Sequence, residues 1–142
     1  LVDAVLAARA DDPYRAFRTV TALQDAVQTP AWPAALTAYA RCKRIVRPLT
    51  ERYPLAPAAL TGEAAQPLYE SYLLAQAQVT PDSDVDVLVN ALIGLTMPIN
   101  RFFEQVMVMA DDPVQRSANL GLLQSIAALA DGVVDLSKVQ GF

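Results

Sequence analysis

A chain of 142 residues with 54% hydrophobic residues is long enough to bury one core, so we expect a single domain spanning residues 1–142. It contains no His, one Cys and five Gly, which excludes a His-based catalytic triad, a His or Cys zinc site and a Gly-rich phosphate loop. Its net charge of −4 gives no overall attraction to nucleic acid. We therefore predict no catalytic residues, no metal ligands and no cofactor in this domain.

The N-terminal part of the chain predicts two helices joined by an acidic corner. Residues 1–10 read as the end of one helix, and Asp12 is placed to cap a second helix that runs to about Gln28. Pro13 suits the first turn of that helix, where its missing N–H has no partner to lose. Trp32 lies in the next break and is expected to lock that corner by packing on the helix that follows.

The segment from Pro33 to Arg47 is the most asymmetric helix that the pattern predicts. At 100° per residue, one side is apolar and is formed by Ala35, Ala38, Tyr39, Cys42, Ile45 and Val46. The opposite side carries four cations in one continuous arc: Arg41, Lys43, Arg44 and Arg47. Arg52, in the Pro-rich connection that follows, adds a fifth positive charge. We therefore predict one basic face, with these cations pointing the same way.

Three helical segments are predicted in the middle of the chain. A short helical turn is expected at residues 58–60, and a longer helix at residues 67–79. A third helix begins at Val85 and is expected to end at Thr96. Pro98 is expected to interrupt it, because proline has no N–H to donate and disfavours a helical residue before it.

The last third of the chain predicts two helices joined by a second acidic corner. The first begins at Pro98 and has an aromatic inner stripe at helical spacing, formed by Ile99, Phe102, Phe103, Val106 and Ala110. Asp112 is placed to cap the final helix, which begins at Pro113 and extends to about Leu136. The wide apolar arc of the final helix indicates contacts with more than one neighbour, so we expect it to be the central packing element.

These segments together predict an all-α fold, a helical bundle of about six to seven helices. The single Cys42 fits a reducing compartment, and no apolar run approaches membrane-spanning length, so we expect a cytoplasmic protein with no membrane partner. The chain begins at Leu1 without an initiator Met or a targeting pattern. We therefore expect it to be a fragment of a longer polypeptide.

The charge is unevenly distributed between the two parts of the chain. Residues 1–58 contain eight Lys or Arg and five Asp or Glu, a balance of +3, whereas residues 59–142 contain three and ten, a balance of −7. Binding depends on the potential within about a Debye length, roughly 8–10 Å at ordinary salt. A basic face can therefore bind phosphate even though the whole chain is acidic.

The second acidic corner also carries a family resemblance. Residues 98–112 read P-x-x-x-F-F-x-x-V-M-V-M-A-D-D and are followed by Arg116, Leu120, Leu122 and Leu123. This pattern resembles the C-terminal anticodon-binding domain of the bacterial glycyl-tRNA synthetase β subunit, which is related to that of arginyl-tRNA synthetase. The resemblance extends to V-L-A-A-R-A-D-D-P at residues 5–13, P-L-Y-E at residues 67–70 and D-L-S at residues 135–137. It covers nearly the whole chain in order.

The resemblance implies that the domain grips the anticodon end of glycine tRNA while other parts of an α/β subunit assembly carry out aminoacylation. The implied partners are glycine tRNA, the remainder of the β subunit and the α subunit, with no DNA partner. ATP and magnesium would be used by the parent enzyme and not by this domain. The candidate RNA-binding residues are Arg41, Lys43, Arg44 and Arg47, followed by Arg52 and Tyr39.

Two other interpretations remain open from the residues alone. Most charge-rich helix faces are simply solvated, and this one could belong to a protein-interaction or subunit-docking module without RNA contact. Val108 supports the second interpretation, because it is apolar on the outward side of the aromatic helix. Arg116 is expected to make a structural tie with Glu104 or Asp111 rather than to contact RNA.

Overall fold

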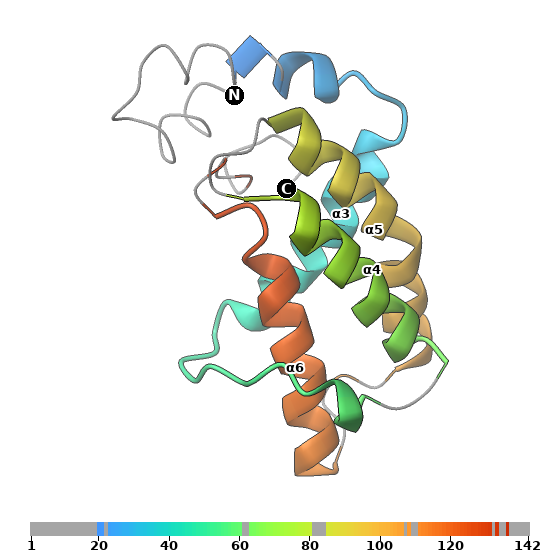
Figure 1. Ribbon diagram of the computed structural model, residues 1–142, viewed down its shortest axis with the longest axis vertical. Coiled ribbons are helices and arrows are strands. Elements are labelled where there is room, and N and C mark those ends of the chain that lie inside the picture. Colours follow the sequence, from blue (N-terminus) through green and yellow to red (C-terminus); the bar gives the residue numbers. More distant parts are fainter. Residues whose placement is uncertain are drawn as a thin grey trace.

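The computed structural model describes residues 20–21, 23–60, 63–80, 85–106, 108, 111–131, 133 and 136 (Figure 1). In these residues the regular structure consists of helices alone, which confirms the predicted all-α class. The helices are α3 (Trp32–Val46), the short 3₁₀ helix η1 (Pro57–Ala59), α4 (Ala65–Gln78), α5 (Val85–Gln105) and α6 (Pro113–Ala127), preceded by helical residues at 20–21 and 23–26. That number is close to the six to seven predicted. The first acidic corner, with Asp12 as its proposed cap, lies outside the described residues.

The boundaries of α3 follow the predicted helix to within one residue at each end. Pro33 lies in its first turn, where a proline removes no helical hydrogen bond. Trp32 begins the helix and is only 2% exposed, as expected for a side chain that packs in the corner. Tyr39 and Cys42 are fully buried on the inner side of α3.

One continuous helix, α5, replaces the two helices predicted on either side of Pro98. Pro98 lies inside α5, so the predicted interruption is wrong. A proline in a helix interior costs about 3 kcal/mol. The apolar stripe that offsets this cost continues across the proline without a change of spacing, and each of its members is at most 1% exposed: Leu88, Leu92, Leu95, Ile99 and Phe102. Packing on both sides of Pro98 therefore overrides its local effect.

By length and composition alone, α5 could cross a membrane. It has 21 residues, and its most apolar 18-residue stretch has a mean hydropathy of 1.2, which corrects the expectation that no apolar segment reaches spanning length. A single helix of this kind is weak evidence, since the core helix of a bundle has the same composition. Its apolar stripe is buried against α3 and α4, so we interpret α5 as the core helix of this bundle.

The N-terminus of α6 matches the predicted corner. The Asp112 carboxylate accepts a hydrogen bond of 3.0 Å from the backbone N–H of Val114, and Pro113 occupies the first turn. The N-cap prediction for Asp112 is therefore confirmed. The helix ends at Ala127 and is followed by turns, so the predicted extension to Leu136 is wrong.

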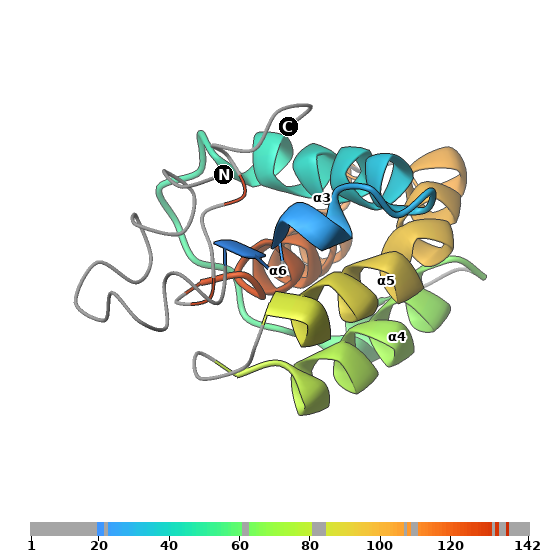
Figure 2. The ribbon, with the colours of Figure 1, turned by 90° about the horizontal axis from the view of Figure 1, so that it is seen from above.

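The core lies where α3 packs on both α5 and α6 and where α4 packs on α5. Figure 2 shows α4, α5 and α3 following one another across the bundle. The broad buried surface of α6 contacts α3, η1 and α4, as the width of its apolar arc predicted. The expectation that α6 is the central packing element needs correction, because α3 and α5 share that place: like α6, each packs on two of the other long helices.

Candidate nucleic-acid interface

The four cations of α3 do not act as one group. Arg41 and Lys43 are two residues apart, so they stand about 160° apart around the helix axis, at opposite edges of the predicted arc. The guanidinium carbon of Arg41 lies 4.3 Å from the ring centroid of Phe103 on α5. That ring meets Phe102 edge to face, with centroids 5.8 Å apart and planes at 82°. The prediction that all four cations point the same way is therefore wrong.

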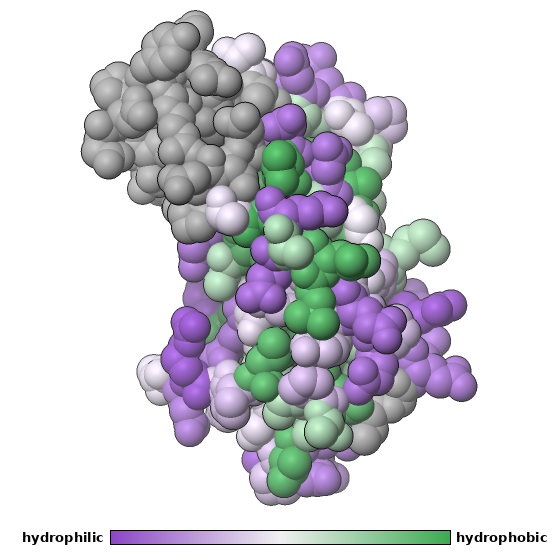
Figure 3. Space-filling model, in the orientation of Figure 1, coloured by the Kyte–Doolittle hydropathy of each residue, from purple (hydrophilic) through white to green (hydrophobic). Residues whose placement is uncertain are grey.

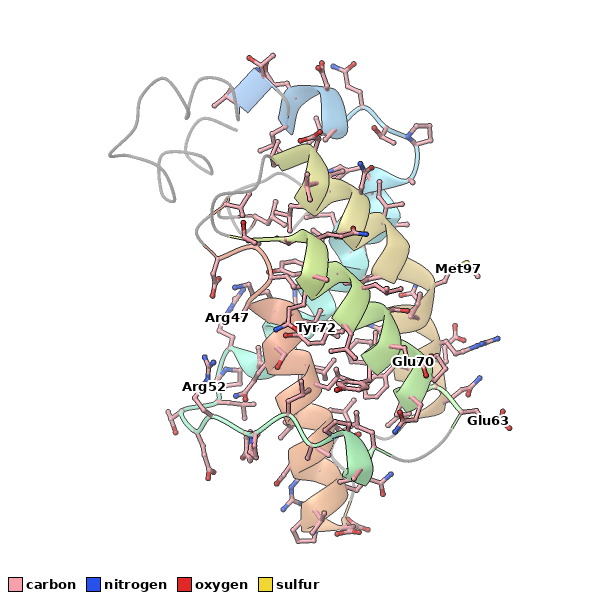
Figure 4. The ribbon with its side chains drawn as sticks, in the orientation of Figure 1. Arg47, Arg52, Glu63, Glu70, Tyr72 and Met97 are labelled. Carbon is pink, nitrogen blue, oxygen red and sulfur yellow. The ribbon has the colours of Figure 1, made fainter. Side chains whose placement is uncertain are left out.

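The other edge of α3 opens onto a groove of about 610 Å³, which we call the cationic groove. Its wall is formed by the C-terminal ends of α3 and α6 and by the start of the connection after α3. The lining residues are Lys43, Val46, Arg47, Leu49, Arg52, Gln124, Ala127, Ala128 and Asp131. Figure 4 shows Arg47 and Arg52 on the same side of the molecule, beside α6. Three of the six predicted site residues are thus brought together here.

The charges in the cationic groove are three cations and one carboxylate. The Lys43 Nζ lies 3.9 Å from an Asp131 carboxylate oxygen, and the two side chains are 35% and 70% exposed. An exposed pair of this kind contributes about 0–1 kcal/mol, so it does not commit Lys43 to a fixed partner. Arg47 and Arg52 are both exposed at the surface. The groove therefore has a positive balance that solvent and ligands can reach.

Tyr39 and Arg44 do not line the cationic groove. Tyr39 is fully buried, and its hydroxyl donates a hydrogen bond to the carbonyl oxygen of Ala127 at the end of α6. Its ring cannot stack on a base from this position, so its assignment as an RNA-binding residue is wrong. Its role is to tie α3 to α6. Arg44 is exposed on α3 outside the groove lining.

The segment after α3, residues 49–56, crosses over α6, and we call it the crossing segment (Figure 1). The Gln124 side chain of α6 makes two hydrogen bonds with its backbone. The amide nitrogen of Gln124 donates to the carbonyl oxygen of Glu51 at 2.8 Å, and its amide oxygen accepts from the N–H of Tyr53 at 2.9 Å. Sequence reasoning missed Gln124, because a contact between residues more than 70 positions apart leaves no periodic signal.

Cys42 offers no chemistry to the site. Its thiol is buried in the core, and burial raises its pKa from 9.0 to about 12. The thiol therefore stays protonated and unreactive at neutral pH, as expected for a structural cysteine. In the part of the chain that the structure describes, no cluster of three or more His, Cys, Asp or Glu side chains is placed to hold a metal ion.

Val108 is not on an outward surface. It is only 8% exposed, and its carbonyl oxygen accepts a hydrogen bond of 3.4 Å from the Asn119 side chain of α6. The predicted support for a docking surface at Val108 is therefore wrong, because α5 ends at Gln105 and Val108 itself contacts α6 through Asn119. Arg116 is half-buried, and its predicted tie to Glu104 or Asp111 stays a prediction.

The fold and the cationic groove define a helical domain with a surface suited to a polyanion. The relatives of this chain include beta subunits of glycine–tRNA ligases. It is 32% identical over 142 residues to the glycine–tRNA ligase beta subunit of Moorella thermoacetica, covering 98% of this chain and 20% of that protein. It is 32% identical over 145 residues to the beta subunit of Anaeromyxobacter sp. (strain K), covering 99% of this chain and 21% of that protein.

A plant protein shows the same relationship. The glycine–tRNA ligase, chloroplastic/mitochondrial 2, of Arabidopsis thaliana is 28% identical over 144 residues, covering all of this chain and 14% of that protein. No family model matches the chain. The chain spans about one fifth of the bacterial relatives' length and is homologous to a small C-terminal part of glycine–tRNA ligase beta subunits. This homology confirms the resemblance to the C-terminal part of the glycyl-tRNA synthetase β subunit.

Proposed function

We propose that this chain is the tRNA-binding domain of a glycine–tRNA ligase beta subunit and holds the anticodon end of glycine tRNA. Aminoacylation with ATP and magnesium would take place elsewhere in the enzyme, since the chemistry of this domain is that of a binding surface. Its partners would be glycine tRNA, the remainder of the beta subunit and the alpha subunit. We expect the domain to bind tRNA in the cytoplasm.

The observation that carries this proposal is the convergence of Lys43, Arg47 and Arg52 on one groove. Lys and Arg side chains hold RNA mainly by neutralising phosphates, and the released counterions make such binding dependent on salt. The net charge of −4 does not oppose it, because charges beyond about 8–10 Å are screened at ordinary salt. Phosphate contacts position the RNA, whereas base contacts give the specificity.

The experiment measures binding of glycine tRNA to the 142-residue chain at several salt concentrations. Arg47→Ala and Arg52→Ala should each weaken binding, and each should reduce the slope of log affinity against log salt by roughly 0.7–0.9, the share of one neutralised phosphate. Arg101→Ala is the matched control. Arg101 is an exposed arginine of α5 that lines a separate cavity with Met97 and Glu104. Its replacement with Ala lowers the net charge by as much as either groove variant does, but leaves the cationic groove unchanged.

Specificity for the anticodon is tested with altered tRNA. Glycine anticodons share C at their second and third positions, so a reader of those bases should bind a tRNA changed there more weakly, by about 1–3 kcal/mol for each base contact. If Arg47 and Arg52 hold phosphates, replacing either with Ala should weaken binding of the natural tRNA and of the altered tRNA by the same factor. Equal binding of the natural and altered tRNA would contradict anticodon reading.

A protein-docking role without RNA contact is the second candidate, and it now depends on different residues. Leu74 on α4 is 69% exposed and Met97 on α5 is 80% exposed. Figure 3 shows hydrophobic side chains scattered among hydrophilic ones on the face seen in the orientation of Figure 1, and Figure 4 shows Met97 projecting away from the bundle. Single exposed apolar residues are normal on soluble proteins, so this observation is the weaker one. Unchanged tRNA binding in both groove variants would favour docking.

A further inference from the structure

Gln124 makes hydrogen bonds with the backbone of the crossing segment on either side of Arg52. Its two hydrogen-bond partners are the carbonyl oxygen of Glu51 and the N–H of Tyr53, which belong to the two peptide groups nearest Arg52 in the chain. One side chain of α6 therefore fixes the backbone from which the Arg52 side chain projects. Glu51 and Arg52 are themselves exposed.

Gly121, one turn earlier on α6, brings the same segment close to the helix. A Cβ atom added to Gly121 would lie 2.4 Å from the carbonyl oxygen of Pro54, which is closer than any real Cβ contact. Because the clashing atom belongs to the backbone, a larger residue here must displace the crossing segment. Gly121 and Gln124 thus set the distance and the register of the segment on α6.

Arg47 and Arg52 depend on this attachment to different degrees. Arg47 caps α3, and its backbone N–H donates to the carbonyl oxygen of Lys43 at 2.9 Å, so the helix itself positions it. Arg52 lies in a segment with no regular structure, and α6 must position it. Ordering a free side chain on binding costs affinity, and ordering it beforehand removes that cost.

We infer that Gln124 is a positioning residue for polyanion binding, which places Arg52 at the cationic groove so that Lys43, Arg47 and Arg52 engage one RNA phosphate backbone together. This inference rests on the proposed function. Gln124 acts through Arg52 and contributes no charge of its own. Glutamine suits the role because its amide supplies one donor and one acceptor, and the two peptide groups beside Arg52 require both.

The test is a double-mutant cycle on glycine tRNA binding to the 142-residue chain. Gln124→Met removes both hydrogen bonds and keeps a side chain of similar length. Alone, it should weaken binding about two- to tenfold, the cost of ordering one arginine and its segment. Combined with Arg52→Ala it should add almost no further loss, because the residue that it positions is gone. Combined with Arg47→Ala it should keep its full effect.

A general loss of structure would give a different pattern. Gln124→Met would then weaken binding by the same factor in both backgrounds, and that result overturns the inference. The same result is expected if Gln124 contacts RNA itself. Gly121→Ala displaces the segment through Pro54 and provides a second variant, for which the same dependence on Arg52 is expected.

A measurement on the unmodified chain tests the inference without relying on variants that could fold differently. The Tyr53 amide hydrogen should exchange slowly with solvent, because it donates to Gln124. Rapid exchange at Tyr53 would overturn the inference. If Arg52→Ala weakens tRNA binding while Gln124→Met does not, the inference fails and the proposed function stands. If neither Arg47→Ala nor Arg52→Ala changes binding, the proposed function fails.

Discussion

The two edges of α3 carry the same kind of side chain in different surroundings. At one edge Arg41 lies over the ring of Phe103, and that ring rests against the fully buried Phe102. At the other edge Lys43 and Arg47 border an open groove beside α6. The neighbouring helix decides the difference: α5 offers an aromatic ring, whereas the end of α6 offers polar groups and space.

This difference predicts that the two edges respond differently to substitution. An arginine supported by an aromatic ring has part of its charge engaged within the protein and contributes to stability. A lysine or arginine at the cationic groove contributes little to stability while exposed, and keeps its charge available for phosphate. The Arg41 edge should therefore affect unfolding, and the groove edge should affect binding.

The largest effect is expected at the aromatic support of the Arg41 edge. Phe102→Ala should lower the free energy of unfolding by roughly 3–5 kcal/mol, because it empties the space of a fully buried ring. Met97→Ala is the control on the same helix, since Met97 is 80% exposed and its truncation should change stability by less than about 0.5 kcal/mol. Denaturant unfolding measures both. Similar stability of the two variants would contradict the core assignment of Phe102.

The next effect concerns α6, which forms a wall of the cationic groove. Asp112→Ala should cost about 0.5–2 kcal/mol of stability, because the carboxylate caps the Val114 N–H at the far end of this helix. Asp111→Ala removes the same charge from the neighbouring exposed residue and should cost less. Thermal unfolding distinguishes them. Well below the unfolding temperature, tRNA binding should be the same for both variants; a selective loss in Asp112→Ala would link the cap to the groove.

Part of the fold and part of the site could be predicted from the sequence, for identifiable reasons. The α3 boundaries and the Asp112 cap depend on local chemistry, which sequence reasoning reads well. The local rule for proline predicts a break at Pro98, although the apolar spacing from Leu95 to Ile99 continues across it. Tertiary packing outweighs the local rule there. In α5, the periodic apolar pattern predicts the extent of the helix better than the position of the proline does.

The site divides in the same way. Charge patterning finds Lys43, Arg47 and Arg52, because cations on a helix and its following loop are visible in the sequence. It cannot find Gln124, which bonds to residues more than 70 positions away. The ring of Tyr39 suggests a role in binding, but its position on the apolar side of α3 places it in the core. Residue type alone is therefore not enough to assign a residue to the binding site; its side of the helix must be considered as well.

A smaller effect on stability is expected at Arg41 itself. Arg41→Ala should lower the free energy of unfolding by about 0.5–1 kcal/mol, the usual contribution of an exposed cation–π contact. Its effect on the salt dependence of tRNA binding should be negligible, because Arg41 is turned away from the cationic groove. Arg47→Ala should show the reverse pattern. If Arg41→Ala reduces the salt dependence as much as Arg47→Ala does, the separation of the two edges fails.

The smallest effect on stability is expected at Asp131, the carboxylate of the cationic groove. Asp131→Asn removes a negative charge 3.9 Å from Lys43, and because Asp131 is 70% exposed the pair adds little to stability. The change should nevertheless strengthen tRNA binding up to about fivefold at low salt, since two unit charges at this distance interact by about 1 kcal/mol in water. The gain should diminish as salt screens the charges.

The matched control for Asp131→Asn is Glu70→Gln, which removes a negative charge from an exposed residue of α4. Figure 4 shows Glu70 on the side of the molecule away from Arg47 and Arg52. Both variants raise the net charge by one, so a response to overall charge would be equal in the two. Stronger binding in Asp131→Asn alone would show that the local charge beside Lys43 governs affinity. Equal strengthening in both variants would mean that the groove has no special role in attracting tRNA.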